Sequence, residues 1–184
     1  AMAISLVLPF FVSSRHFILE IYMQSLSSTA STSMVSMLLF VGFVLNPIFS
    51  FIATSSGDKY GLDNMLLVVF VINALGVFIE AMADHLWLFT AGFYVSRVAV
   101  MDVTMAYIAV ILPHKHAVSY MSKFYTMASI IYLIGPLLSG LIVHYLSYRN
   151  VFWLNTITLS VATLSVWFFL VGSQRNLQTL QRRL

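Results

Sequence analysis

Six apolar segments, each close to the length that a helix needs to cross a bilayer, constrain the fold more than any other feature of the sequence. About 20 helical residues cover the roughly 30 Å of hydrocarbon in a membrane. Few charged residues interrupt the segments, and mostly short polar stretches separate them. The predicted spans are residues 4–26, 34–54, 65–83, 86–112, 124–146 and 151–171.

The composition supports this interpretation. Hydrophobic residues make up 60% of the chain and charged residues 8%, whereas a soluble domain carries about 25% charged residues. A chain with so little polar surface is solvated by lipid, where backbone groups must be satisfied within helices. The sequence therefore predicts an all-α membrane protein in the lipid bilayer. Residues 1–172 would form a six-helix transmembrane bundle, and residues 173–184 a cytoplasmic tail.

Several classes of function are excluded. The chain has no cysteine, so it forms no disulfides. No Lys/Arg-rich run interleaves with aromatic residues, which argues against a nucleic-acid partner. His114 and His116 lie in a Lys-bearing stretch without nearby carboxylates, and we interpret them as a solvated pair and not a metal site. No phosphate-binding loop or catalytic Ser/His/Asp grouping is recognisable, so we expect neither an enzyme nor a cofactor.

The basic residues predict an orientation. In a chain of six spans, the second, fourth and sixth connectors share one side of the membrane. The basic residues on that side are Lys59, Lys115, Lys123, Arg175, Arg182 and Arg183. The opposite side carries only Arg149. Because basic residues favour the cytoplasmic side, both termini are expected there.

Glu20 is a charged residue inside the first apolar segment, and His16 lies one helical turn before it. A charge in the membrane costs at least about 2–3 kcal/mol, so it usually faces a cavity or a partner. We interpret Glu20 as a protonatable group that faces a central cavity, with His16 beside it. The alternative is that the first span ends near Ser14 and that Arg15 and His16 lie at an interface.

The third and fourth segments contain further charges. Arg97 and Asp102 are five residues apart, so they do not stack on one helical face. Arg97 can meet Glu20 across the bundle and modulate its protonation, or it can hold two helices together or snorkel. Glu80 and Asp84 lie near the end of the third segment, and we expect both at the outer membrane interface.

Small residues gather in the fifth segment, at Gly135, Ser139 and Gly140. Small residues on one helical face allow another helix to approach closely, and Pro136 interrupts the backbone hydrogen bonds. We therefore expect the fifth helix to pack tightly and to bend. Arg149, in the short turn that follows, is expected to cap the negative C-terminal end of that helix.

The stretch from residue 135 to residue 155 resembles the fifth-to-sixth helix region of the major facilitator superfamily. It is most similar to proton-coupled drug antiporters of the bicyclomycin/chloramphenicol-efflux type. Their antiporter motif reads G-x-x-x-G-P-x-x-G-G, and Ile131 and Ser139 replace two of its glycines here. The residues that match this motif and the W/Y-R/H-x-x-F-W-x-x-N pattern after it are Gly135, Pro136, Gly140, Tyr148, Arg149, Phe152, Trp153 and Asn155.

Other motifs of the family fall at the expected places. The gating loop G-x-x-x-D-R/K-x-G-R/K-R/K keeps Asp58, Lys59 and Gly61, but Leu62 and Asp63 replace its trailing basic pair. In the fourth-helix motif R-x-x-Q/H-G, Arg97 is kept and Met101 replaces the glycine. The first-helix motif D/E-x-Y-L-P-A-L is matched by Glu20, Tyr22 and Leu26.

The resemblance covers the N-terminal six of the family's usual twelve helices. It implies a substrate cavity between two six-helix halves, and a lone half would expose its cavity face to lipid. The chain is therefore expected to be a fragment of a twelve-helix protein, to form a homodimer, or to pair with an unlike membrane protein.

The function that the resemblance implies is export of small, mostly apolar or cationic molecules by proton antiport, in a bacterial inner membrane. Glu20 would carry the proton, Arg97 would modulate it, and His16, Tyr22 and Asp102 would line the substrate cavity. The alternative is a transport-inactive subunit with a transporter-derived fold that packs against or regulates another membrane complex.

Overall fold

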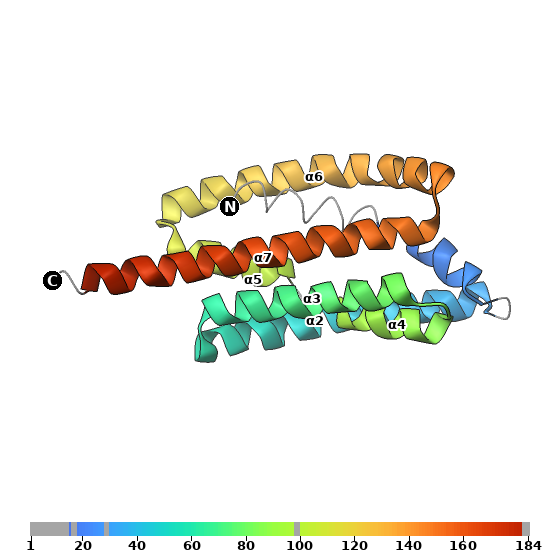
Figure 1. Cartoon of the computed structure of the whole chain (residues 1–184), viewed down its shortest axis with the longest axis horizontal. Helices are drawn as coiled ribbons and strands as arrows, with labels where there is room; N and C mark the ends of the chain where they lie inside the picture. Colours follow the sequence, from blue (N-terminus) through green and yellow to red (C-terminus); the bar gives the residue numbers. More distant parts are fainter. Residues whose placement is uncertain (1–14, 16–17, 28–29, 98–99, 182–184) are drawn as a thin grey trace.

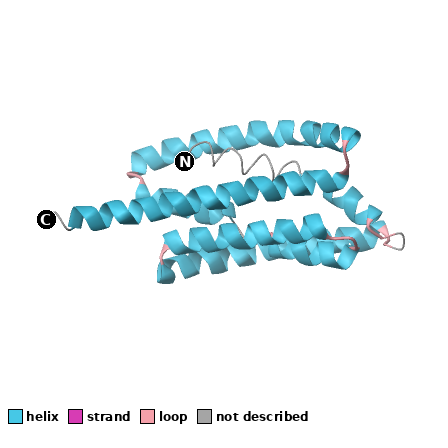
Figure 2. Cartoon of the chain, viewed as in Figure 1, coloured by secondary structure: helices cyan, strands magenta, loops and turns pink. Residues whose placement is uncertain are grey.

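The computed structural model in Figure 1 shows long helices lying side by side. It describes residue 15 and residues 18–27, 30–97 and 100–181, with only the backbone described for residues 114, 115 and 172–181. Every regular element in this part of the chain is a helix (Figure 2). The prediction of an all-α fold is therefore confirmed.

Residues 18–25 form a first helical segment, and six longer helices follow it. They are α2 (Thr32–Tyr60), α3 (Leu62–Met82), α4 (Leu86–Val95), α5 (Val100–Ile111), α6 (His114–Tyr145) and α7 (Tyr148–Gln181). Within the described residues, five stretches are long and apolar enough to cross a membrane, with α4 and α5 counted together over Leu86–Ile111. The predicted first span lies largely outside the described residues.

Two of the predicted connectors are helical instead. The polar stretch before residue 61 belongs to α2, and Gly61 alone separates α2 from α3, with a φ of 89° that favours glycine. The stretch after Pro113 belongs to α6. The predicted loops were wrong because a helix keeps its own hydrogen bonds beyond the hydrocarbon, so polarity does not mark its end. The N-terminus of α2 is capped by Ser31, whose side chain accepts a hydrogen bond from the backbone N–H of Met34.

The fourth predicted span is divided in two. Its hydrophobic pattern is continuous, but α4 ends at Val95 and α5 begins at Val100. A chain that leaves the helix inside a membrane must find other donors for its carbonyl groups. The end of α4 is therefore a place where side chains from neighbouring helices are needed.

α3 is the centre of the packing. It contacts α2, α4, α5 and α7, and α6 lies outside α7 at the edge of the molecule (Figure 1). One buried cluster lies mainly between α3, α5 and α7, around Phe70 and Val103. A second joins the first helical segment to α4 and α7, around Met23, Phe89 and Phe152. Many large apolar side chains of α2 and α6 point outward, as expected for helices that face lipid.

Candidate functional site

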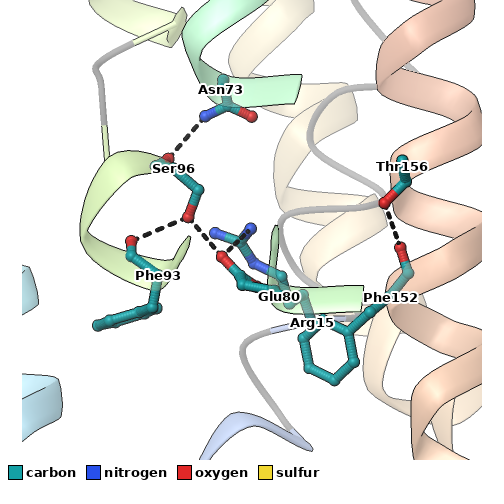
Figure 3. Close-up of polar contacts among 7 residues, drawn as sticks. All are labelled: Arg15, Asn73, Glu80, Phe93, Ser96, Phe152 and Thr156. Carbon is teal, nitrogen blue, oxygen red and sulfur yellow. Dashed lines mark hydrogen bonds and ion pairs between the residues drawn. The ribbon is translucent and has the colours of Figure 1, made fainter. Parts of the chain in front are cut away.

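The most buried charged side chain among the described residues is Glu80 of α3, which is 0% exposed. Arg15 donates to Glu80 Oε1 from Nη1 over 3.1 Å, and its side chain is 6% exposed. The hydroxyl of Ser96, at the end of α4, lies 2.6 Å from the same oxygen. The carboxylate therefore joins the first helical region, α3 and α4 at one atom (Figure 3).

Two side chains of α3, Asn73 and Glu80, form hydrogen bonds with Ser96. Asn73 Nδ2 donates to the backbone carbonyl of Ser96 over 2.6 Å, so it satisfies a carbonyl at the end of α4. The Ser96 hydroxyl also lies 2.9 Å from the carbonyl of Phe93. Because a hydroxyl has one proton, its shorter contact, with Glu80, is the charge-assisted one. Figure 3 shows Ser96 between Asn73 and Glu80.

Two glycines allow α3 and α4 to come this close. A Cβ atom at Gly76 would overlap the backbone nitrogen of Ser96. A Cβ atom at Gly92 would lie 2.8 Å from both the backbone nitrogen of Glu80 and the carbonyl oxygen of Gly76. Asn73, Gly76 and Glu80 thus form a stripe along α3, which we call the α3 stripe, and the end of α4 rests on it.

Arg97 follows Ser96 and is 7% exposed. Its guanidinium carbon lies 4.1 Å from the ring centroid of Phe93 and 5.2 Å from that of Phe43 in α2. Both are cation–π distances. Gly42 makes room for this arrangement, because a Cβ there would overlap the Phe93 ring. The charged groups that act on Arg97 include Arg15 and Glu80.

Within the described residues, no group of three or more His, Cys, Asp or Glu side chains could hold a metal ion. The cluster instead combines one carboxylate with two guanidinium groups inside an apolar bundle. Ionisable groups buried in a membrane domain typically mark ion or substrate pathways.

Comparison with known proteins decides the family. The sequence model of the Major Facilitator Superfamily matches residues 1–183. The chain belongs to this superfamily. It is also 24% identical over 121 residues to an uncharacterized transporter of Buchnera aphidicola subsp. Acyrthosiphon pisum. That match covers 65% of this chain and 31% of the relative, so the matched region corresponds to about a third of the relative's length. Membership in this superfamily makes the chain a transporter-family membrane protein and supports the expectation that it is not an enzyme.

The structure separates the two residues that the superfamily resemblance suggested for proton coupling. Glu20 is exposed on the first helical segment, whereas its neighbours Leu19 and Tyr22 are buried. Arg97 is buried beside Glu80, not beside Glu20. His16 lies outside the described residues.

The two other residues expected at the substrate cavity lie in different surroundings. Tyr22 packs in the apolar core, with its ring 5.0 Å from that of Phe152 and 5.3 Å from that of Phe89. Asp102 of α5 is exposed and accepts a hydrogen bond of 2.6 Å from the hydroxyl of Ser50 in α2. Among the described residues, no contact joins Asp102 to the charged cluster of Arg15, Glu80 and Arg97.

The antiporter motif of the superfamily lies in α6, which runs through Pro136 without interruption. Gly135 is buried, and the hydroxyl of Ser139 bonds back to the Gly135 carbonyl. Gly140 is exposed, with no described atom within 4 Å of its Cβ position. The tight packing expected at the small residues is thus absent at Gly140 within the described part of the chain. Farther along the pattern, Asn155 is 1% exposed, and neither of its side-chain polar atoms has a hydrogen-bond partner there.

The gating-loop residues lie at the α2–α3 junction. Asp58 and Lys59 are exposed on the last turn of α2, with Lys59 Nζ 5.1 Å from the Tyr60 ring, and Gly61 forms the turn. The positions of the usual basic pair are used differently here. Leu62 packs against Gly57, and Asp63 is a hydrogen-bond partner of Tyr107 in α5.

Arg149 caps a helix, but not the predicted one. It donates to the carbonyls of Ala81 and Met82, at the end of α3, and pairs with Asp84 at 3.0 Å. Among the described residues, the polar contacts of Arg149 are all with the end of α3 and the turn after it, and none is with α6. The favourable charge at a helix C-terminus is therefore supplied across helices.

The expectation that both Glu80 and Asp84 lie at an interface was half wrong. Asp84 is exposed, with 79% of its side chain accessible, whereas Glu80 is buried. Its partner Arg15 is 65 residues away in sequence. Spacing alone does not reveal such a pair, although one signal was present: Arg15 and Glu80 are both charged residues inside predicted spans.

Proposed function

We propose that this chain is part of a secondary active transporter that exports small, mostly apolar or cationic molecules in exchange for protons. The observation that carries the proposal is the burial of Arg15, Glu80 and Arg97 within a bundle of lipid-facing helices. Buried charges are costly in a membrane and are retained where they serve ion or substrate movement. A carboxylate supplies a proton site, and cation–π surroundings suit organic cations.

In this proposal Glu20 carries the exchanged proton at the substrate cavity. The position of Glu20 supports this role. One side of the first helical segment is buried in the bundle, and Glu20 lies on the other, exposed side. In transporters of this construction, the cavity lies at the interface of two repeats. An exposed acid on one bundle would face that interface once a second bundle covers it. Arg97 would modulate proton release from its buried position.

The second bundle is itself proposed, as either a further part of the same polypeptide, a second copy, or an unlike membrane protein. The matched region covers 31% of its transporter relative. Exposed apolar residues on α2 and α6, together with the open surface at Gly140, offer a face for such a partner. The mass of the detergent-solubilised particle distinguishes one copy, two copies and a mixed complex.

The experiment is transport by the purified chain in proteoliposomes loaded with a fluorescent lipophilic cation. An imposed pH gradient should drive cation movement, and a protonophore should stop it. Glu20→Gln should abolish the gradient-driven component while the protein stays folded. Asp84→Asn is the matched control, because it removes an acid at a turn outside the bundle. Unchanged transport in Glu20→Gln would exclude Glu20 as the coupling acid, and no gradient-driven transport by the wild type would exclude the proposed function of this chain alone.

We further propose a bacterial inner membrane, with Lys59 on the cytoplasmic side and Arg149 on the outer side. The excess of basic residues on the proposed inner side supports this orientation. Single cysteines at residues 59 and 84 should react with an impermeant thiol reagent from opposite sides. Reaction of both from the same side would refute it.

A second candidate function is a transport-inactive subunit that packs against another membrane complex. One observation favours it: the positions of the usual basic pair in the gating loop are occupied by Leu62 and Asp63, which make contacts within the chain. Restoring the pair with Leu62→Arg and Asp63→Arg tests it. A transporter whose gating depends on this loop should gain transport from the change, whereas an inactive subunit should gain none.

A further inference from the structure

Arg15 and Glu80 form a buried ion pair in which each charge depends on the other. Among the described residues, Glu80 is the one hydrogen-bond partner of Arg15, and the Nε atom of Arg15 has none. Arg15 is held next to the first helical segment, and Glu80 belongs to α3. The charge on one side chain is therefore what holds the other in the protein interior.

We propose that Glu80 is a second proton-binding site, and that its protonation releases Arg15 and with it the first helical segment from α3. This deepens the proposed function, on which it rests for its role in transport. Glu20 would exchange protons at the cavity, and Glu80 would convert a proton into movement of a helix.

The physical reason is a reciprocal coupling. Burial opposes the charge on a carboxylate, and a guanidinium beside it supports that charge. When Arg15 is in place, the charged form of Glu80 is supported. When Arg15 leaves, burial prevails and Glu80 takes a proton. By linkage, the proton in turn weakens the hold on Arg15. A buried guanidinium that loses its counter-charge is strongly unfavourable, so Arg15 must move toward water or toward another anion.

The geometry leaves a place for the proton. Arg15 and Ser96 both contact Glu80 Oε1, whereas Oε2 is buried and has no hydrogen-bond partner in the described part of the chain. A proton from solvent would bind Oε2 and form a neutral acid, with no other bond made or broken. Because Oε2 is shielded from solvent, the proton enters during brief openings at the first helical segment, and its binding then favours the released position of Arg15.

The other charged groups around Glu80 do not replace Arg15. From the end of α4, Arg97 acts on Glu80 through its charge, but its guanidinium lies against the rings of Phe93 and Phe43. From α6, Tyr132 acts on Arg97. The direct ionic contact of the carboxylate is with Arg15, so this contact responds first when the charge is lost.

Protonation also loosens the contact with α4. The Ser96 hydroxyl can turn its single proton toward the Phe93 carbonyl, 2.9 Å away, when Glu80 is no longer charged. Asn73 and the Gly76 contact would keep the end of α4 on the α3 stripe. The movement should therefore be confined to the first helical segment, while α3 and α4 stay together.

The first experiment detects the proton. Infrared difference spectra of the wild type in lipid nanodiscs, taken between about pH 9 and about pH 5, should show a carbonyl stretch of a protonated buried acid. Because Glu20 contributes a band of its own, Glu80→Gln should lose only one component of the band, and Glu20→Gln should keep that component. Identical spectra for the wild type and Glu80→Gln, or no band in the wild type, would overturn the proposal.

The second experiment detects the movement and uses the absence of native cysteine. Spin labels on Ile21→Cys and Leu75→Cys, both at exposed positions, report the distance between the first helical segment and α3. Labels on Leu75→Cys and Leu164→Cys report α3 and α7 as a control. Acid should add a longer distance for the first pair and leave the control pair unchanged.

Two variants give the test, and a third serves as their matched control. Arg15→Gln should show the longer distance at all pH values, and so should Glu80→Gln if it folds; Glu20→Gln should respond to pH like the wild type. A distance for the first pair that ignores pH in the wild type would mean that the pair is purely structural and would overturn the proposal. Neither experiment measures transport, so the proposal for Glu80 and the proposed function can fail independently.

Discussion

α3 and α6 are both long apolar helices, but they are packed in opposite ways. In the most apolar stretch of α3, 39% of the residues are buried, against 17% in α6. The polar side chains of α3, such as Asn73 and Glu80, bond to other helices. The hydroxyls of Thr126 and Ser129 in α6 bond back to carbonyls of α6 itself. α3 is thus an internal scaffold, and α6 is a surface that lipid or another bundle covers.

The difference explains where charge is tolerated. A hydroxyl in lipid can return to its own helix, but a carboxylate needs donors from elsewhere. Such donors exist only where several helices converge, and α3 is the helix on which they converge. A change to the polar contacts of α3 should therefore have a large effect, and a comparable change in α6 a small one.

The largest expected effect comes from Arg15→Met, which leaves the Glu80 charge buried without its partner. Breaking a buried pair from one side typically costs about 3–5 kcal/mol of unfolding free energy. The double variant Arg15→Met, Glu80→Met should recover most of that loss, because neither charge remains. The control on α6 is Lys123→Met, at an exposed position. Stability is measured by thermal unfolding in nanodiscs, and a single variant as stable as the wild type would contradict the role of the pair.

Next comes Gly76→Ala, because its new methyl group would overlap the backbone of Ser96, which cannot rotate away. Forcing a methyl group into a packed site costs about 1–3 kcal/mol. Gly140→Ala on α6 is the matched control, since its Cβ position is open within the described part of the chain. It should change stability by less than about 0.5 kcal/mol. Equal losses in the two variants would show that Gly140 is covered by a partner.

The sequence allowed the number and approximate position of the later spans to be predicted, because hydropathy reports burial in lipid directly. It did not allow the division of α4 from α5 to be predicted, since the C-cap of α4 is Ser96, whose contacts with Asn73 and Glu80 of α3 are not reflected in hydropathy. Arg149 shows the same limit: its role as a cap was predicted, but the carbonyls that it reaches lie 67 and 68 residues away. Glu80 was misplaced for this reason as well.

A loss no larger than that of Gly76→Ala is expected for Asn73→Leu, which removes the donor to the Ser96 carbonyl and keeps a similar volume. A buried carbonyl left without a partner costs about 1–3 kcal/mol, and the hydroxyl of Ser96 remains to hold the contact with Glu80. Thr126→Val is the counterpart on α6, and its loss should be within about 0.5 kcal/mol. The measurement is again the unfolding temperature of both variants. If Thr126→Val were the more harmful, the α3 stripe would not be what supports the end of α4.

The smallest effect is expected outside the apolar region, in the exposed turns that follow α3 and α6. The turn after α3 and the turn after α6 meet through Asp84 and Arg149, whose side chains are 79% and 42% exposed. An exposed ion pair contributes about 0–1 kcal/mol and is screened by salt, so Asp84→Asn should lower stability slightly at low salt and not at high salt. Arg149→Met should lower it more and keep most of its effect in salt, because it also removes the donors to Ala81 and Met82. A salt-independent loss in Asp84→Asn would show that this turn is shielded from water, and hence that a partner covers this end of both helices.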